Sequence, residues 1–169
     1  HREKRGWLEQ THLMGNSIRY TFDIHNLNNK IIDDMTEAQL DNGLVPDIAP
    51  EYVPFLGGFR DSPEWGSACI LVPWDMFKWY GDISAIKKAY PMMKKYLQYL
   101  ESKAVNNILS YGLGDWYDLG PKFPGEAQLT PKAVTATSIF FYDAKLLTEM
   151  AGLIGENEDA KTCRNLSEK

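Results

Sequence analysis

Apolar residues recur along most of this chain at the spacing of a helix face. Over 83–100 they follow one another at alternating steps of three and four residues, and Asp82 stands just ahead as a suitable N-cap. Similar stripes run over 24–35 and 139–154, whereas no segment of useful length alternates as a strand would. The pattern predicts an all-α fold with helices at 9–22, 24–40, 66–80, 83–107, 132–154 and 157–169.

The connections between these predicted helices fall into two classes. Tight turns are expected at Asp23, at Gly81-Asp82 and at Gly155-Glu156, so the helices form pairs. Long stretches rich in Gly, Pro and aromatic residues, 41–63 and 110–131, separate one pair from the next. Loops of this length in a compact domain are usually functional or disordered, and their aromatic content argues against disorder.

Tryptophans occur at a nearly regular spacing in or next to these long connections. Trp7, Trp65 and Trp116 each precede the first helix of a pair and are 58 and then 51 residues apart. A helical hairpin repeated at such a period indicates a solenoid or a closed ring. With about three hairpins, the chain would supply half of an (α/α)6 toroid. Its long loops would then gather at one mouth of the ring.

Composition narrows the function classes. The net charge of −5 argues against a nucleic-acid-binding or anionic-membrane surface, and no apolar run reaches the length of a membrane span. Cys69 and Cys163 have neither disulfide-framework nor zinc-site spacing, so we interpret both as core residues. Aromatic residues, at 12%, gather with acidic residues in the long loops.

No metal-binding cluster, phosphate-binding glycine loop or nucleophile elbow is present, and nothing implies a cofactor. Carboxylates can supply an acid and a base, and flat rings can pack on a sugar. The residues therefore favour carboxylate chemistry on a polar substrate, as in glycoside hydrolysis.

Motifs in a fixed order refine this hypothesis. The chain opens on His-Arg-Glu-Lys-Arg-Gly-Trp at 1–7 and continues with Asn-Gly-Leu-Val-Pro-Asp at 42–47. Glu-Trp-Gly at 64–66, Val-Pro-Trp at 72–74 and Gly-Asp-Trp at 114–116 follow. In this order the motifs resemble glycoside hydrolase family 78, the bacterial α-L-rhamnosidases, and the resemblance runs nearly from end to end.

The resemblance implies an (α/α)6 barrel that hydrolyses terminal α-L-rhamnosides with inversion, so a rhamnose-containing glycoside or polysaccharide is the expected partner. It implies that Glu3 is the general acid and Arg2 a rhamnose contact. The aromatic wall would comprise Trp7, Trp65 and Trp116, and the general base would be a glutamate beyond the chain.

The chain departs from the family pattern at Glu9-Gln10, where many members have Gly-Asp with a substrate-binding Asp. Gln10 can still bond a hydroxyl, or Glu9 can take over the role. Asp115 is equally interpretable as a ligand or as the cap of a turn. Trp74 and Trp79, at helical spacing, are predicted to lie in the core.

Two other functions fit the pattern: a different exo-glycosidase on the same scaffold, and a non-catalytic helical-repeat binding scaffold. Because the chain opens inside a charged motif and ends in a helical run, residues 1–169 are expected to be part of one catalytic domain, truncated at both ends and inactive alone. The sequence leaves both a cytoplasmic and a periplasmic or extracellular location open.

Overall fold

The chain folds into three helical hairpins. A computed structural model describes residues 5–169, and over this range the fold consists of α-helices and one 3-10 turn. The elements are α1 (Leu8–Leu13), α2 (Gly15–Arg19), α3 (His25–Ala38), η1 (Gly57–Phe59), α4 (Pro63–Gly66), α5 (Ala68–Tyr80), α6 (Ile83–Lys103), α7 (Lys132–Ile154) and α8 (Asn157–Ser167).

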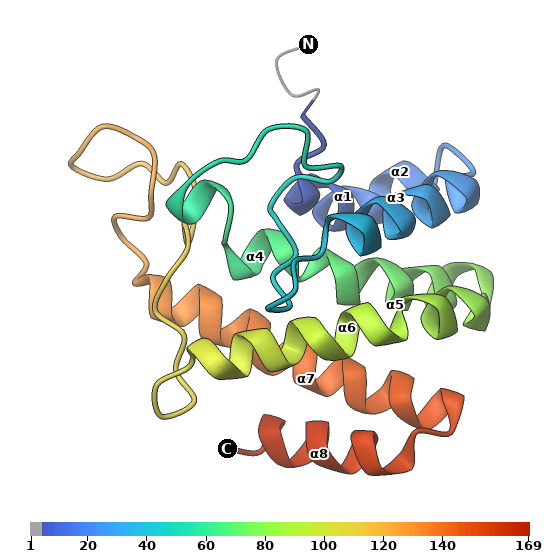
Figure 1. Ribbon diagram of the computed structural model, residues 1–169. Coiled ribbons are helices and arrows are strands. Elements are labelled where there is room, and N and C mark those ends of the chain that lie inside the picture. The colour runs from blue at the N-terminus through green and yellow to red at the C-terminus, as the bar shows by residue number, and fades with distance from the viewer. Residues whose placement is uncertain (1–4) are drawn as a thin grey trace.

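The tight turns and the long connections lie at opposite ends of the helices. Figure 1 shows the α2–α3, α5–α6 and α7–α8 turns at one end and the long loops at the other. Gly81 and Gly155 close α5 and α7 with φ of 70° and 88°, a left-handed backbone that glycine adopts without a side-chain clash. The predicted gathering of the long loops is confirmed.

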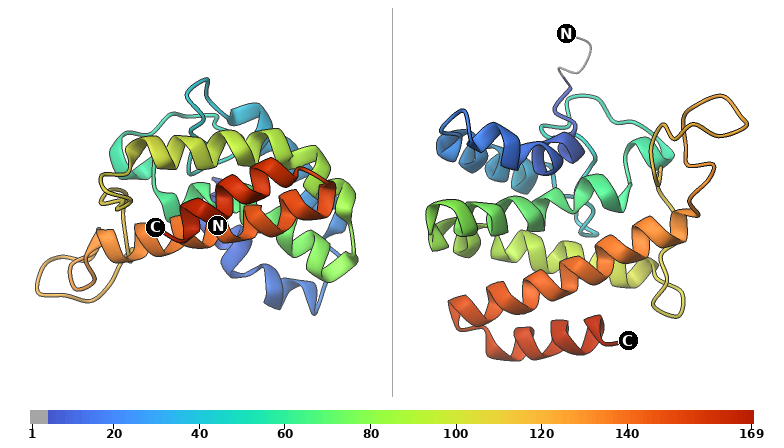
Figure 2. Two further views of the ribbon diagram at one scale, coloured as in Figure 1. Left: turned by 90° about the horizontal axis from the view of Figure 1, so that it is seen from below. Right: turned by 180° about the vertical axis from the view of Figure 1, so that it is seen from behind.

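The helices pack in two layers, as expected of hairpins in a ring. The first helices of successive hairpins, α1, α5 and α7, lie side by side, and α3 and α6 pack behind them (Figure 2). Helix α5 is buried over most of its length because α1, α3, α6 and α7 all pack against it. Cys69 in α5 and Cys163 in α8 are both buried in this core, as predicted.

Three local expectations are wrong. The helix predicted at 9–22 is broken at Met14, where Gly15, a weak helix former, begins α2. The helix predicted to run to 107 ends at Lys103, because Asn106 and Asn107 take a left-handed backbone in the following turn. Trp79 is 40% exposed rather than in the core, whereas Trp74 packs against the core as predicted.

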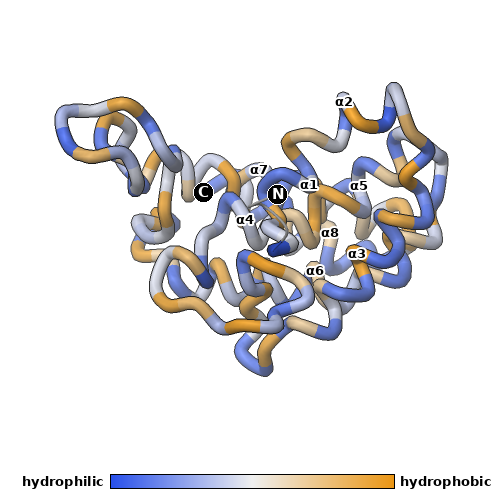
Figure 3. The backbone as a smooth tube through the Cα atoms, turned by 90° about the horizontal axis from the view of Figure 1, so that it is seen from above, coloured by the Kyte–Doolittle hydropathy of each residue, from blue (hydrophilic) through white to orange (hydrophobic). Residues whose placement is uncertain are grey.

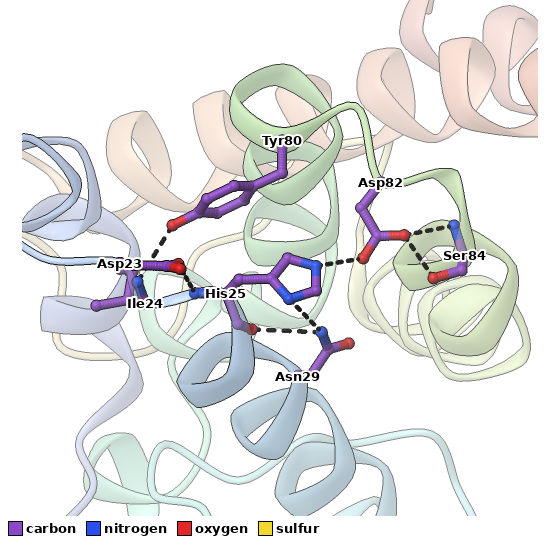
Figure 4. Close-up of polar contacts among 7 residues, drawn as sticks. All are labelled: Asp23, Ile24, His25, Asn29, Tyr80, Asp82 and Ser84. Atoms are coloured by element: carbon purple, nitrogen blue, oxygen red, sulfur yellow. Dashed lines mark hydrogen bonds and ion pairs between the residues drawn. The ribbon is translucent and has the colours of Figure 1, made fainter.

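A polar junction joins the first two hairpins at the end with the tight turns (Figure 4). The Asp82 carboxylate accepts the Ser84 N–H at 2.9 Å and so caps α6 as predicted. Its second oxygen lies 2.8 Å from Nε2 of His25, the first residue of α3. Hydrogen bonds from Ser84 and His25 keep the pKa of Asp82 below its usual value. This junction fixes α3 against the α5–α6 turn, away from the mouth.

Candidate active site

A cavity of about 540 Å³ opens at the end of the molecule that carries the long loops. Seen from above, these loops extend away from α1 and α2 on one side of the molecule (Figure 3). The volume of the cavity lies within the range of small-molecule sites. Three separate stretches of chain line it: the N-terminal segment, the 41–63 loop with α4, and the loop before α7. The lining residues are Arg5, Trp7, Gln10, Phe59, Trp65, Leu113, Trp116 and Tyr117. The structure therefore brings Gln10 together with the three regularly spaced tryptophans, Trp7, Trp65 and Trp116.

One side of the cavity is a continuous series of aromatic rings. Trp7 stacks on Phe55 with 5.3 Å between centroids, and Phe59 meets Trp116 edge-on at 5.2 Å. Phe59 also lies 6.5 Å from Trp7. Sequence reasoning missed Phe55 and Phe59, because loop residues show no periodicity. Their spacing around Gly57-Gly58, where the chain turns sharply, is the only signal that could have identified them.

The three tryptophans differ in exposure. Trp65 belongs to the short helix α4 rather than to a loop, and it is only 3% exposed, so little of its indole reaches the cavity. Trp7 and Trp116 are partly exposed. Trp65 therefore forms the base of the cavity, while Trp7 and Trp116 form its sides.

Acidic side chains lie close to the aromatic rings. Burial, together with the smaller effect of the neighbouring carboxylates of Glu64 and Asp115, raises the pKa of Glu9 in α1 to about 7. Burial also raises the pKa of Glu64, against an opposing effect of Thr135 and Lys132. Glu9, with a pKa near 7, can hold a proton near neutral pH, as acid–base or hydroxyl-binding residues do.

Asp61 and Glu64 stand close to the start of α4, but neither side chain caps that helix. Helix α4 begins after Ser62, and no side chain of the described residues caps it. Asp61 instead accepts a hydrogen bond from the Tyr99 hydroxyl, and Glu64 turns toward Glu9 and α7. Glu64 is thus a carboxylate beside the site, for which the sequence analysis proposed no role.

Asp118, not Asp115, holds the local turn of the third segment. Its carboxylate accepts the N–H groups of Gln128 and Leu129 at 2.9 and 2.8 Å, which closes residues 116–130 into a projecting lobe (Figure 1). Asp115 is exposed beside the cavity and contributes its backbone carbonyl, at 3.4 Å, to the Asp118 N–H. Of its two interpretations, the side-chain cap finds no support in the described residues, and ligand binding stays a prediction.

Comparison with known proteins agrees with this geometry. All of residues 1–169 match the bacterial alpha-L-rhamnosidase 6 hairpin glycosidase domain. The chain belongs to this family. An alpha-L-rhamnosidase of Alteromonas sp. (strain LOR) is 30% identical over 164 residues, which are 94% of this chain and 17% of that protein.

Solved family structures share the fold. The alpha-L-rhamnosidase of Dictyoglumus thermophilum superposes with a TM-score of 0.89 at 28% identity, over 97% of this chain and 18% of that one. The Streptomyces avermitilis enzyme, solved with L-rhamnose, gives 0.83 at 28% identity, over 98% and 15%. The three hairpins are thus part of an (α/α) barrel, and the chain spans less than a fifth of the length of each of these three relatives.

Two of the predicted site residues, Arg2 and Glu3, lie outside the described residues. Arg5, shortly after them, lines the cavity, and its guanidinium lies 5.4 Å from the centroid of Phe55. Within residues 5–169, no cluster of three or more His, Cys, Asp or Glu could hold a metal ion. In the same range no helix has the length and apolarity needed to cross a bilayer.

Proposed function

We propose that the protein to which this chain contributes hydrolyses terminal α-L-rhamnosides with inversion of configuration, using two carboxyl groups. The observation that carries the proposal is the cavity walled by Trp7, Trp65 and Trp116 with half-buried Glu9 beside it. Indole faces can pack on the C–H faces of a sugar, and carboxyl and amide groups can bond its hydroxyls. The family relationship and the L-rhamnose bound to a relative support the choice of sugar.

Each residue then has a role. Glu3 donates a proton to the leaving oxygen, Arg2 contacts the rhamnose, and a glutamate beyond this chain activates water on the opposite side of the ring. In inverting glycosidases the two carboxyl groups stand roughly 6.5–9.5 Å apart, which leaves room for that water. Gln10 and Glu9 bond sugar hydroxyls in place of the family's Gly-Asp pair, and Asp115 adds a further acceptor.

The sugar is tested with the full-length protein and a panel of aryl glycosides. Cleavage of the α-L-rhamnoside alone, with the β-anomer of free rhamnose appearing first in a proton NMR time course, is the expected result. Cleavage of a different terminal sugar would support another exo-glycosidase, and no cleavage would support a binding scaffold. The α-anomer as first product would exclude inversion.

The role of Glu3 is tested by Glu3→Gln. General acid catalysis is typically worth about 10²–10⁴-fold and matters most for poor leaving groups. The rate at which the variant hydrolyses natural glycosides should therefore fall by that factor, while much of the activity on activated aryl rhamnosides remains. The alkaline limb of the pH profile should disappear. Glu149→Gln, at an exposed position of α7, is the control. Equal losses on good and poor leaving groups would make Glu3 a binding residue.

A further inference from the structure

Two buried polar residues lie where the tryptophan-bearing segments meet. Asp47 and Ser62 are 0% and 1% exposed, and neither lines the cavity. Both belong to the long 41–63 connection, which passes between the N-terminal segment and the loop before α7. Buried polar groups normally have hydrogen-bond partners, so the partners of these two residues show what they hold together.

Asp47 binds the N-terminal segment to the long loop. Its carbonyl accepts the N–H of Leu8, the neighbour of Trp7, at 2.9 Å, and its own N–H donates to the Arg60 carbonyl at 3.1 Å. An antiparallel bridge between Trp7 and Ile48 extends the same contact. The Asp47 carboxyl then accepts the Ser62 N–H at 2.9 Å. Trp7 is thereby fixed to the residue that precedes α4.

Ser62 carries the connection to the other rings. Its hydroxyl donates to the Gly58 carbonyl at 2.6 Å, next to Phe59, and accepts the Leu113 N–H at 2.8 Å, three residues before Trp116. Its carbonyl accepts the Trp65 N–H at 3.0 Å. The hydroxyl and the carbonyl of Ser62 are therefore hydrogen-bonded to backbone groups at or close to three residues whose rings line the cavity: Phe59, Trp65 and Trp116.

The close approach of the third segment depends on a glycine. Gly112 has φ of 95°, and a Cβ there would come within 3.0 Å of both the Ser62 hydroxyl and the Pro63 ring. A side chain at 112 would push Leu113, and with it Trp116, away from Ser62. The backbone is thus shaped for this one contact.

We infer that Asp47 and Ser62 are positioning residues that set the relative placement of Trp7, Phe59, Trp65 and Trp116 around the sugar. The inference deepens the proposed function and rests on it for the identity of the sugar. Neither residue touches the substrate, and both act through the backbone of the segments that they join. Because misplacing a binding group by about 1 Å can cost up to about a hundredfold in rate, such a junction matters to turnover.

The protonation state of the Asp47 carboxyl supports a positioning role rather than a catalytic one. Burial first, and then the nearby Asp61, Glu64 and Glu9 carboxylates, raise its pKa to about 9, against the opposing effect of the Ser62 N–H. The group is therefore uncharged at neutral pH, and its Oδ2 atom is buried with no hydrogen-bond partner among residues 5–169. An uncharged carboxyl that acts as an acceptor is closely mimicked by an amide, whereas a catalytic carboxylate is not.

The test compares four variants of the full-length enzyme, Ser62→Ala, Asp47→Ala, Asp47→Asn and the control Thr148→Ala. Thr148 in α7 has a buried side chain, and in the described part of the chain its hydroxyl bonds only the carbonyl of Ala144, one turn back in the same helix. Kinetics on an aryl α-L-rhamnoside and binding of L-rhamnose are measured well below each melting temperature. We expect Ser62→Ala and Asp47→Ala to raise KM and the rhamnose Kd by about ten- to a hundredfold. Asp47→Asn should stay within about threefold of wild type, because its amide oxygen still accepts the Ser62 N–H.

Loss of stability alone would lower the melting temperature of the Ala variants and of Thr148→Ala alike, with KM unchanged in all of them. That result overturns the inference. A defect of Asp47→Asn as large as that of Asp47→Ala, with a lost limb in the pH profile, would also overturn it by making Asp47 a charged catalytic group.

A crystal structure of Ser62→Ala separates this inference from the proposed function. The expected change is a displaced Phe59–Trp116 pair, whose centroids are 5.2 Å apart in the native protein. If the wild-type enzyme cleaves no rhamnoside, the proposed function fails, and the positions of the rings in this variant still decide the inference. Unmoved rings would refute it whatever the activity.

Discussion

The indole of Trp7 lies on the ring of Phe55, with 5.3 Å between centroids and 28° between planes. This stack attaches the N-terminal segment, which carries the proposed acid, to the 41–63 loop. Phe59 of the same loop continues the series to Trp116. One side of the site is therefore a wall built from three distant stretches of chain, and the phenylalanines hold the tryptophans in a common arrangement.

Phe59→Ala tests the wall directly. Each aromatic pair contributes about 0.5–1.5 kcal/mol beyond area burial, so losing the contacts to Trp7 and Trp116 should loosen both rings. We expect the KM for an aryl α-L-rhamnoside to rise about two- to tenfold, with a smaller change in kcat. Tyr52→Ala, 62% exposed in the same loop, is the matched control. Equal kinetics of the two variants would remove Phe59 from the site.

Trp65→Ala and Trp116→Ala should have different consequences. Trp65 is 3% exposed, and removing a buried tryptophan costs about 3–5 kcal/mol, so that variant should unfold at a clearly lower denaturant concentration. Trp116 is partly exposed and should cost less stability while weakening sugar binding. Denaturant melts and KM of both full-length variants check this. A larger stability loss for Trp116 would contradict the assigned burial.

Local periodicity was sufficient for most of the helices. The stripes predicted α3, α6 and α7 because each buries one face, and the glycine and acid turns marked the hairpin ends. The periodicity could not show that Trp79 is exposed. The spacing of residues indicates which helix face they share, but not whether another element covers that face. The predicted helix ends were wrong where a local backbone conformation ends the helix earlier, as before Asn106.

The site was partly predictable. Trp7, Trp65, Trp116 and Gln10 came from the repeat and the family resemblance, and the structure places all four on the cavity. Phe59 and Tyr117 were missed because a loop residue reaches a site through long-range backbone contacts that leave no local pattern. The Asp47 motif was noticed, but its role depends on partners at Leu8 and Ser62 that only the fold reveals.

Asp82→Ala should destabilise the fold without changing the kinetics. The variant loses the α6 cap, worth about 1 kcal/mol, and the contact with His25. The junction lies at the α5–α6 turn, at the end of the helices opposite the long loops (Figure 1), so KM and kcat should not change. Because the folded pKa of Asp82 is depressed, its contribution to the free energy of unfolding is present above the ordinary carboxyl pKa and is lost as pH falls through the folded value.

Asp82→Asn, which can still accept the Ser84 N–H, should lose less stability than Asp82→Ala. Urea melts of both variants provide the comparison, and an undiminished midpoint in Asp82→Ala would contradict the assignment.

Glu9 should make the stability of the enzyme depend on pH in the neutral range. Its folded pKa of about 7 stands above the ordinary glutamate pKa of 4.5, so between these limits the folded state holds a proton that the unfolded chain has released. The free energy of unfolding should therefore fall as pH rises through this window and level off above it.

Glu9→Gln removes the titrating group, so the variant should gain stability relative to wild type as pH rises from about 4.5 to 7 and show no further gain above that. Urea midpoints of the two full-length proteins, measured across the window, give this difference directly, and other titrating groups cancel in it. Glu158→Gln, at an exposed position of α8, should follow wild type throughout. Since Glu64 helps to raise the pKa of Glu9, Glu64→Gln should move the window to lower pH. Parallel curves for wild type and Glu9→Gln would mean that Glu9 is ionised at neutral pH and binds the sugar only as an acceptor.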